Sequence, residues 1–391
     1  MTETKNNTGE NEFPIPSNIH SLKDLLDIAS GKSLNQQIPQ EDSGLAEINP
    51  YPFFAIMGQD DLKLGLLLSV INPNIGGILL IGPRGTGKTT AARSLLSLLP
   101  VIEKSTCYYG CTPKDIEIGG IDSVCPDCAK KYAEGSLKTN IEPMKLIELP
   151  LNSSLEDVIG SLDERAKLHH RMRIKKGILA QADQGVLFTD EVNLLPNVIT
   201  DAILDAASQG TYTVRHGPIS ATYWARFILI GSMNPEEGSL RPQIMDRFGI
   251  RILVKGLESP VYRQEAYRRV ISHKSNPNAF ISFYSEDIIC ARKEIKNARQ
   301  LLPSVELSKK AIELGSTIIK EMQLESLRAE LALFEAARAY AAARNSTTVT
   351  EEDIRIVAPI TLTMRRSSFM AEFVKNLQKE NDEIKNLLGR L

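Results

Sequence analysis

The chain has 391 residues, of which 42% are apolar and 24% are charged, and its formal net charge is −2. This length allows two or three domains with a sizeable core. The near-neutral charge gives no basic footprint for sequence-independent nucleic-acid binding, so such a partner is not expected. No apolar run approaches the roughly 20 residues of a membrane span, and the first residues lack the apolar core of a signal peptide. We therefore expect a cytoplasmic protein without a membrane partner, in which thiols stay reduced.

The character of the sequence changes along the chain. Residues 1–47 are polar with little apolar periodicity and are expected to form a flexible arm. Between residues 48 and 258, apolar strands alternate with helices, which predicts an α/β domain whose parallel sheet has helices on both faces. Residues 259–368 show helical patterns without strands and predict an all-α domain. Residues 369–391 form either a docking helix with a weak heptad or a charged tail.

The predicted elements of the two domains are bounded as follows. Strands are expected at 78–81, 144–149, 185–189 and 227–230. Helices are expected at 197–209, 262–270, 285–300, 308–322, 327–344 and 351–363.

A glycine-rich loop follows the first strand and fits G-x-x-x-x-G-K-[ST] at every fixed position. The loop and the start of the next helix comprise Gly82, Pro83, Arg84, Gly85, Thr86, Gly87, Lys88, Thr89 and Thr90. Its backbone N–H groups and the positive end of the helix would face bound phosphates. Lys88 would reach the outer phosphates, and the Thr89 hydroxyl would hold Mg²⁺. The motif predicts a site for a nucleoside triphosphate with its Mg²⁺.

Polar residues follow the later strands at positions that suit ATP hydrolysis. Asp190 would join the Mg²⁺ shell, and Glu191 would polarise the attacking water. Asn234 would hydrogen-bond the γ-phosphate or the water, although an asparagine before proline is also a common turn residue. Arg247 is a candidate for an arginine finger that acts across a subunit boundary, with a solvated surface arginine as the alternative.

These motifs together resemble those of AAA+ ATPases. Four strings, at 52–59, 190–195, 231–238 and 240–249, closely resemble the I subunit of magnesium chelatase and its chelatase-like (MoxR-type) relatives. The resemblance covers roughly residues 49–359, and it implies an AAA+ P-loop α/β core followed by an all-α lid domain.

The resemblance also implies a role for each matching residue. The roles are Walker A for Lys88 and Thr89, Walker B for Asp190 and Glu191, sensor 1 for Asn234, and arginine finger for Arg247. Arg328, in the string Leu327–Glu330, corresponds to the sensor 2 arginine of the lid, which contacts the phosphates. Arg226 matches a family arginine at the subunit interface.

The segment between the phosphate loop and the acidic pair is long. Lys88 and Asp190 lie 102 positions apart, whereas a minimal βαβ arrangement needs about 50. The excess contains a cysteine segment at 105–135 and a stretch at 158–182 that resembles the family's inserted hairpin, which projects into the ring and acts on partners. Basic residues gather at its tip: Lys167, His169, His170, Arg171, Arg173, Lys175 and Lys176. They predict either a solvated face or a contact with an acidic partner or nucleic acid.

Four of the five cysteines fall in one window, as Cys107-x3-Cys111 and Cys125-x2-Cys128. Two close pairs across a short loop are typical of a tetrahedral site of four thiolates, and structural Zn²⁺ is the leading interpretation. A redox-active pair, an Fe–S cluster and free thiols are the alternatives. Chelatase-like relatives often carry such an insert, whereas other I subunits lack these cysteines. Cys290, beside Ile288 and Ile289, is expected in a helix core.

The resemblance implies a metal chelatase motor: a homo-oligomeric ring, expected to be a hexamer, with ATP held between neighbouring subunits. Its partners would be a second AAA+ subunit with an integrin-like (von Willebrand) domain and a large porphyrin-binding subunit that inserts Mg²⁺. The alternative is a chelatase-like remodelling ATPase that activates a von Willebrand-type partner with no tetrapyrrole involved. A DNA-directed ATPase is disfavoured by the net charge of −2.

Overall fold

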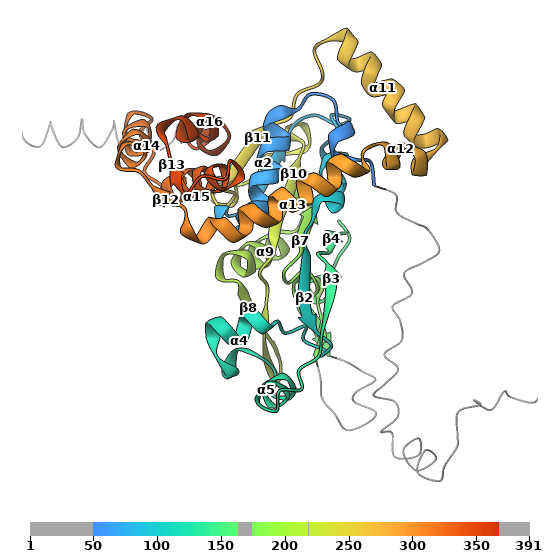
Figure 1. Ribbon diagram of the computed structural model, residues 1–391, viewed down its shortest axis with the longest axis vertical. Coiled ribbons are helices and arrows are strands. Elements are labelled where there is room, and N and C mark those ends of the chain that lie inside the picture. Colours follow the sequence, from blue (N-terminus) through green and yellow to red (C-terminus); the bar gives the residue numbers. More distant parts are fainter. Residues whose placement is uncertain (1–49, 163–173, 218, 367–391) are drawn as a thin grey trace, which may run out of the picture. The chain divides into compact units, whose positions relative to one another are not determined.

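The computed structural model describes residues 50–162, 174–217 and 219–366 of the chain. The predicted arm and C-terminal segment lie outside these residues. At the centre is a five-stranded parallel sheet of order β11-β1-β10-β7-β4 (Figure 1). Its strands are β1 (Ile78–Ile81), β4 (Leu146–Leu149), β7 (Val186–Thr189), β10 (Ile228–Met233) and β11 (Ile250–Leu253). The α/β sheet that the sequence predicts is therefore confirmed.

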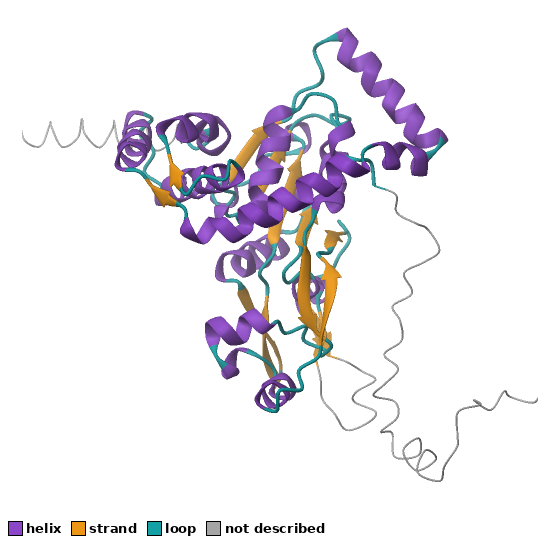
Figure 2. Cartoon of the chain, viewed as in Figure 1, coloured by secondary structure: helices purple, strands orange, loops and turns teal. Residues whose placement is uncertain are grey.

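Helices cover both faces of the sheet, because successive side chains of each strand point to opposite sides. Ile78 and Leu80 belong to one buried cluster, which includes residues of α2 (Asp60–Ile71). Leu79 and Ile81 belong to the other cluster, which includes residues of α9 (Asn197–Gln209). Strand β1 is thus a continuous apolar run rather than an alternating one. Figure 2 shows the helices that surround the strands of the sheet.

The fifth strand, β11, was not predicted from the sequence. Its central residue is Arg251, which interrupts the apolar run, yet the side chain is only 2% exposed. The Arg251 Nη1 donates a hydrogen bond to the carbonyl of Met364 at 2.6 Å, and Nη2 lies 3.4 Å from an Asp246 carboxylate oxygen. Burial lowers the pKa of Arg251 to about 10, with the nearby Arg365 acting in the same direction. These partners allow the arginine to be buried within a strand. Its charge interrupts the apolar pattern, so the sequence carries no signal for this strand.

The part of the chain after residue 259 is mainly helical. Its helices are α11 (Pro260–Ser275), α12 (Pro277–Phe283), α13 (Ser285–Leu301), α14 (Lys309–Glu321), α15 (Leu327–Ala343) and α16 (Glu351–Leu362). The expectation that strands are missing here was wrong, because β12 (Glu306–Leu307) pairs in parallel with β13 (Thr348–Val349). Strands of two residues are too short to produce a periodic pattern. No helix in the described ranges combines the length and apolar character needed to cross a membrane.

Three antiparallel pairs are inserted around the parallel sheet. They are β2 (Val101–Ser105) with β3 (Thr139–Pro143), β5 (Gly160–Leu162) with β6 (Ile174–Lys176), and β8 (Thr211–His216) with β9 (Ile219–Trp224). Helices α4 (Pro113–Gly119) and α5 (Pro126–Ala133) lie between β2 and β3. Helices α6 (Leu155–Ile159) and α8 (Ile178–Gln181) flank the β5–β6 pair. Of the basic residues predicted at the hairpin tip, only Lys175 and Lys176 lie within the described residues.

Candidate functional site

The phosphate loop joins β1 to α3 (Lys88–Ser94). A Cβ atom on Gly82 would lie 2.2 Å from the carbonyl oxygen of Val254, so the adjoining backbone leaves no room for a side chain there. Gly87 has φ 86°, in the left-handed region that favours glycine. These two glycines let the loop turn tightly between strand and helix, which brings its N–H groups to the start of α3.

A cavity of about 280 Å³ opens above this loop. It is lined by Arg84, Gly85, Thr86, Gly87, Lys88, Thr89, Thr90, Asp190, Glu191, Ser232 and Asn234. The lining residues follow or end β1, β7 and β10, so the cavity lies at the carboxyl edge of the sheet, where open α/β sheets bind ligands. The structure therefore brings the predicted loop, the acidic pair and Asn234 together.

Lys88 braces the loop from inside. Its Nζ donates hydrogen bonds to the carbonyl oxygens of Gly82 at 2.6 Å and Pro83 at 2.8 Å. Burial lowers the pKa of Lys88, although Asp190 and Glu237 act in the opposite direction. Gly82 and Pro83 do not line the cavity, and these two bonds connect them to the lysine that does.

Asp190 is held by side chains from two other elements. The Thr89 hydroxyl donates to Oδ2 at 3.0 Å, and the Ser232 hydroxyl donates to Oδ1. Ser232 also accepts a hydrogen bond from the backbone N–H of Glu191 at 3.0 Å. Glu191 has φ 50°, a left-handed conformation that is uncommon for residues other than glycine. The side-chain oxygens of Thr89 and Asp190 thus lie together at the cavity, and oxygen atoms are the ligands that Mg²⁺ prefers. Sequence reasoning missed Ser232, because a serine inside a strand matches no motif.

Asn234 and Glu191 are connected through Glu237 and Arg84. The Asn234 side chain donates from Nδ2 to a Glu237 carboxylate oxygen at 2.8 Å. Arg84 pairs with the same Glu237 and lies 3.6 Å from Glu191. Hydrogen bonds from Asn234 and from Arg84 hold the pKa of Glu237 below its usual range. Sequence reasoning also missed Glu237, which links the phosphate loop to the end of β10.

Arg247 and Arg328, the predicted arginine finger and sensor 2 arginine, lie outside this cavity. Arg247 follows α10 (Pro242–Met245) and pairs with Asp205 of α9 at 2.5 Å. Arg328, at the start of α15, places its Nη1 3.4 Å from an Asp246 carboxylate oxygen. Neither arginine lines the cavity of its own chain. The structure therefore places Arg328 beside Asp246, and its contact with the phosphates stays a prediction.

The four cysteine sulfurs converge in the insert between β2 and β3. All four Sγ atoms of Cys107, Cys111, Cys125 and Cys128 lie within 4.8 Å of one another. A tetrahedral metal with bonds of about 2.3 Å to sulfur separates its ligands by about 3.8 Å, so this donor set fits Zn²⁺. Cys290 was expected in a core, but its side chain is exposed on α13, as is that of Ile289, whereas Ile288 is buried.

Hydrogen bonds to sulfur favour the thiolate form of Cys107, whereas the hydrogen bond with Cys107 and burial raise the pKa of Cys111. The backbone N–H of Cys111 donates to the Cys107 sulfur, and that of Cys125 donates to the Cys111 sulfur, each at 3.4 Å. Side-chain hydrogen bonds with Cys111 and Ser105 lower the pKa of Cys107 to about 3. Burial raises the pKa of Cys128 to about 11. Cys107 is therefore ready to ligate a metal as a thiolate, which is the ligand form of cysteine.

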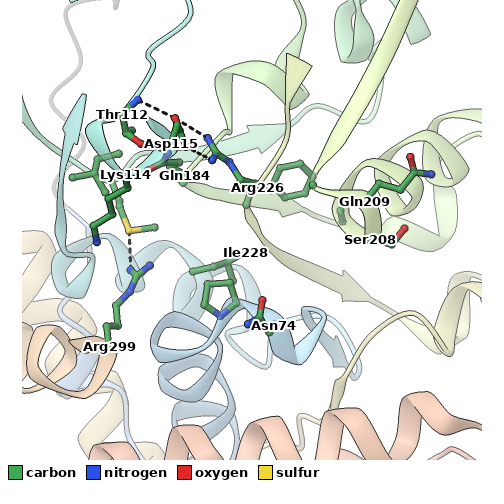
Figure 3. Close-up of a pocket in the computed structure, with 17 residues that line it drawn as sticks. Asn74, Thr112, Lys114, Asp115, Gln184, Ser208, Gln209, Arg226, Ile228 and Arg299 are labelled. Carbon is green, nitrogen blue, oxygen red and sulfur yellow. Dashed lines mark hydrogen bonds and ion pairs between the residues drawn. The ribbon is translucent and has the colours of Figure 1, made fainter. Parts of the chain in front are cut away.

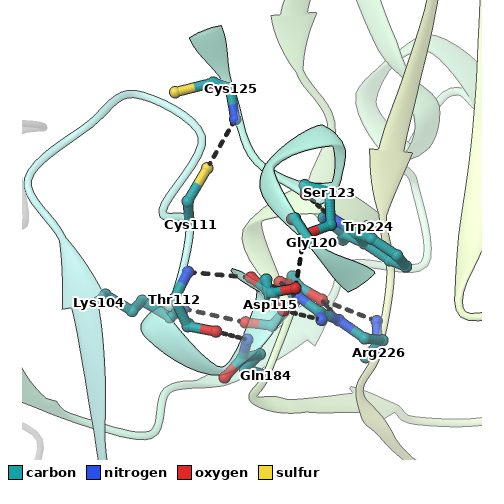
Figure 4. Close-up of polar contacts among 11 residues, drawn as sticks. Lys104, Cys111, Thr112, Asp115, Gly120, Ser123, Cys125, Gln184, Trp224 and Arg226 are labelled. Atoms are coloured by element: carbon teal, nitrogen blue, oxygen red, sulfur yellow. Dashed lines mark hydrogen bonds and ion pairs between the residues drawn. The ribbon is translucent and has the colours of Figure 1, made fainter. Parts of the chain in front are cut away.

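Ionic contacts fix the insert to the strands of the core (Figure 4). Arg226, just before β10, pairs with Asp115 of α4 and with Asp183, whose Oδ2 lies 3.0 Å from Nη2. Its guanidinium also lies 4.3 Å from the centroid of the Trp224 ring, and the Trp224 indole donates to the Ser123 carbonyl at 3.2 Å. The guanidinium of Arg226 is therefore engaged within its own chain.

A second contact joins the insert to the β5–β6 hairpin. The backbone N–H of Lys176 donates to the Tyr108 hydroxyl at 3.3 Å. The Lys176 ammonium lies 4.9 Å from the centroid of the Tyr108 ring and 5.8 Å from that of Tyr109. Burial lowers the pKa of Lys176. Both tyrosines lie between Cys107 and Cys111, so the cysteine cluster and the hairpin stem form one packed unit.

Comparisons with known proteins agree with this site. Residues 77–248 match the AAA domain family (dynein-related subfamily), and residues 313–387 match the AAA lid domain family. The fold and the nucleotide cavity thus define an AAA+ ATPase, as the motifs predicted.

Relatives identify the family within this class. A Methanocaldococcus jannaschii protein named magnesium-chelatase subunit ChlI homolog is 40% identical over 82% of this chain and 87% of its own length. The magnesium-chelatase 38 kDa subunit of Acidiphilium rubrum is 38% identical over 81% of this chain and 90% of its own. A solved chain from a complex of magnesium chelatase subunits BchI and BchD is 36% identical over 84% of this chain and 99% of its own, with a TM-score of 0.47. The chain belongs to the magnesium-chelatase I-subunit family.

Proposed function

We propose that the chain is the ATP-hydrolysing motor of a magnesium chelatase and drives Mg²⁺ insertion into a porphyrin held by a partner subunit. The observation that carries this proposal is the cavity in which Lys88, Asp190 and Glu191 meet. The names of relatives at 38% to 40% identity support the chelatase setting.

Six side chains of the cavity have roles in hydrolysis. Lys88 exchanges the carbonyls of its own loop for the outer phosphate oxygens of ATP. Thr89 and Asp190 hold the Mg²⁺ that accompanies ATP, and Ser232 orients Asp190. Glu191 polarises the attacking water.

Asn234 acts on the same reacting group. Its side-chain amide leaves Glu237 and then hydrogen-bonds the γ-phosphate or the attacking water.

Neighbouring subunits complete the site in a homo-oligomeric ring, which we take to be a hexamer. Arg247 pairs with Asp205 and Arg328 with Asp246, and neither arginine lines the cavity of its own chain, so we assign both to ATP on an adjacent subunit. Arg247→Ala chains should bind ATP but hydrolyse it poorly. Mixing them with Lys88→Ala chains should restore part of the turnover, because an intact cavity then faces an intact arginine. Turnover no higher than the sum of the separate variants would contradict this arrangement.

The ring acts on partners through the inserts. We assign the β5–β6 hairpin to contact with an integrin-like (von Willebrand) AAA+ subunit, and the porphyrin to a separate large subunit. The cysteine cluster holds one structural Zn²⁺ on four thiolates, which keeps the hairpin stem in place through Tyr108 and Lys176. We place this assembly in the cytoplasm, where thiols stay reduced.

An in vitro chelation assay tests the function. The purified chain is combined with the integrin-like and porphyrin-binding subunits of a chelatase, MgATP and protoporphyrin, and Mg²⁺ insertion is followed by porphyrin absorbance. Insertion should occur with the wild type and be lost with Glu191→Gln. Glu236→Gln, an exposed carboxylate of the neighbouring loop, is the matched control and should remain active. ATP turnover without insertion would overturn the chelatase role and favour a remodelling ATPase with a von Willebrand-type partner.

A further inference from the structure

A second cavity, of about 480 Å³, lies at the opposite edge of the sheet (Figure 3). Gly185 and Ile228, which stand where β7 and β10 begin, form part of its wall. It shares no lining residue with the nucleotide cavity. The same two strands therefore run from one cavity to the other, and the second cavity needs an explanation of its own.

Arg299 of α13 enters this cavity without an acidic partner. Its Nη1 lies 3.3 Å from the Met144 sulfur, and among the described residues no carboxylate comes within ion-pair distance of it. Burial lowers the pKa of Arg299. A guanidinium taken out of water without a counter-charge is unfavourable, and a sulfur atom is only a weak acceptor for one of its five N–H donors. Its remaining donors are available to an anion.

Lys114 of α4 supplies a second cation to the cavity. In Figure 3 its amino end points toward the part of the cavity that Arg299 lines. No ion pair of Lys114 occurs within the described ranges. Arg226 also lines the cavity, but it pairs with two carboxylates, Asp115, which lines the cavity as well, and Asp183. Among the described residues, the lining cations without an ion pair are therefore Lys114 and Arg299.

The rest of the cavity offers neutral hydrogen-bonding groups. Asn74, Ser208 and Gln209 lie away from the two cations (Figure 3). Phe227 and Ile228, both buried, add apolar surface. A volume of about 480 Å³ lies within the range of pockets for small organic ligands.

We propose that this cavity binds a small organic phosphate other than the ATP of the nucleotide cavity. Arg299 and Lys114 hold the phosphate, because a doubly charged group matches two cations that line one cavity and a guanidinium can bind two of its oxygens. The polar body of the ligand, such as a sugar, contacts Asn74 and Gln209.

Isothermal titration with ribose 5-phosphate tests the proposal on the full chain with saturating MgADP, which keeps the probe out of the nucleotide cavity. Ribose 5-phosphate should bind, and uncharged ribose should bind at least tenfold more weakly. Inorganic phosphate should also bind more weakly than ribose 5-phosphate, because it lacks the polar body. Absence of ribose 5-phosphate binding, equal binding of ribose, or equal binding of inorganic phosphate would each overturn the proposal.

Variants assign the binding to the two cations. Arg299→Gln and Lys114→Gln should each weaken ribose 5-phosphate binding about tenfold, as expected for loss of one charge-assisted contact. Lys296→Gln, on the same helix α13 and exposed, is the matched control and should bind like the wild type. Lys114 is exposed, so its variant should fold even if Arg299→Gln does not. Wild-type affinity in the Lys114→Gln variant would overturn the assignment.

Discussion

The nucleotide cavity and the cysteine insert are built in different ways. In the cavity, Thr89, Asp190 and Ser232 come from separate elements and meet because the carboxyl ends of parallel strands lie at one edge of the sheet. In the insert, the four cysteines lie within 22 positions, between the paired strands β2 and β3, and are brought together by local turns and the start of α5.

Substitutions in the cavity should therefore affect turnover, whereas substitutions in the insert should affect stability. The sheet positions the cavity residues whether or not ATP is bound, so their substitution should change turnover more than folding. The insert has little core of its own, because Cys111, Ile116 and Cys128 are among its few buried apolar side chains. Its stability should therefore depend on its metal and on the contacts of Arg226 and Lys176.

The largest effect should come from Glu191→Gln. Removing the carboxylate that polarises water should lower ATP turnover about a thousandfold, while ATP affinity and the melting temperature stay near the wild-type values. Turnover and nucleotide binding are measured on the same preparation, with Glu236→Gln as the control. Turnover above a tenth of the wild-type rate would remove Glu191 from the proposed role.

Cys111→Ser should have the next largest effect, and it should change stability instead of turnover. Loss of one thiolate should reduce zinc from about one per chain to a trace and destabilise the insert by about 3 kcal/mol. Metal analysis and thermal unfolding measure this, and the exposed Cys290→Ser is the matched control. If zinc is unchanged, or absent from the wild type as well, the four thiols do not form a zinc site.

Asp115→Asn should weaken the contact between the insert and the core. It removes one of the two carboxylates that pair with the partly buried Arg226, which should cost about 2 kcal/mol. Hydrogen exchange should become faster in α4 and in the insert before it does so in β7. Asp122→Asn, an exposed residue of the same insert, is the control. Uniform destabilisation of the whole domain would show that insert and core are not separable units.

Ser232→Ala should give the smallest effect. It removes the hydroxyl that joins Asp190 to the backbone of Glu191, and turnover should fall about tenfold, equivalent to about 1.4 kcal/mol. Because the residue is buried and alanine is smaller, the melting temperature is measured in parallel. A change in stability without a change in turnover would make Ser232 a packing residue only.

Local patterns made much of the fold and site predictable. The phosphate loop and the cysteine pairs are each contained in a short stretch, so their spacing alone indicates their chemistry. Helix α9 begins and ends at the predicted residues because its apolar positions recur at helical spacing.

Features made by distant residues were not predictable in this way. Strand β11 was missed because Arg251 hides a buried strand, and its partners Asp246 and Met364 are known only from the fold. Ser232 and Glu237 carry no motif. The second cavity combines Asn74, Lys114, Ser208 and Arg299, which no local pattern connects.

The bracing of the phosphate loop by Lys88 has a consequence for the rate of nucleotide association. Because the ammonium already spans the carbonyls of Gly82 and Pro83, the loop holds its curved shape before ATP arrives. Binding then requires the lysine to change hydrogen-bond acceptors and does not require the backbone to order. Association should therefore occur in a single fast phase, and the entropy lost on binding should come mainly from the nucleotide and not from the protein.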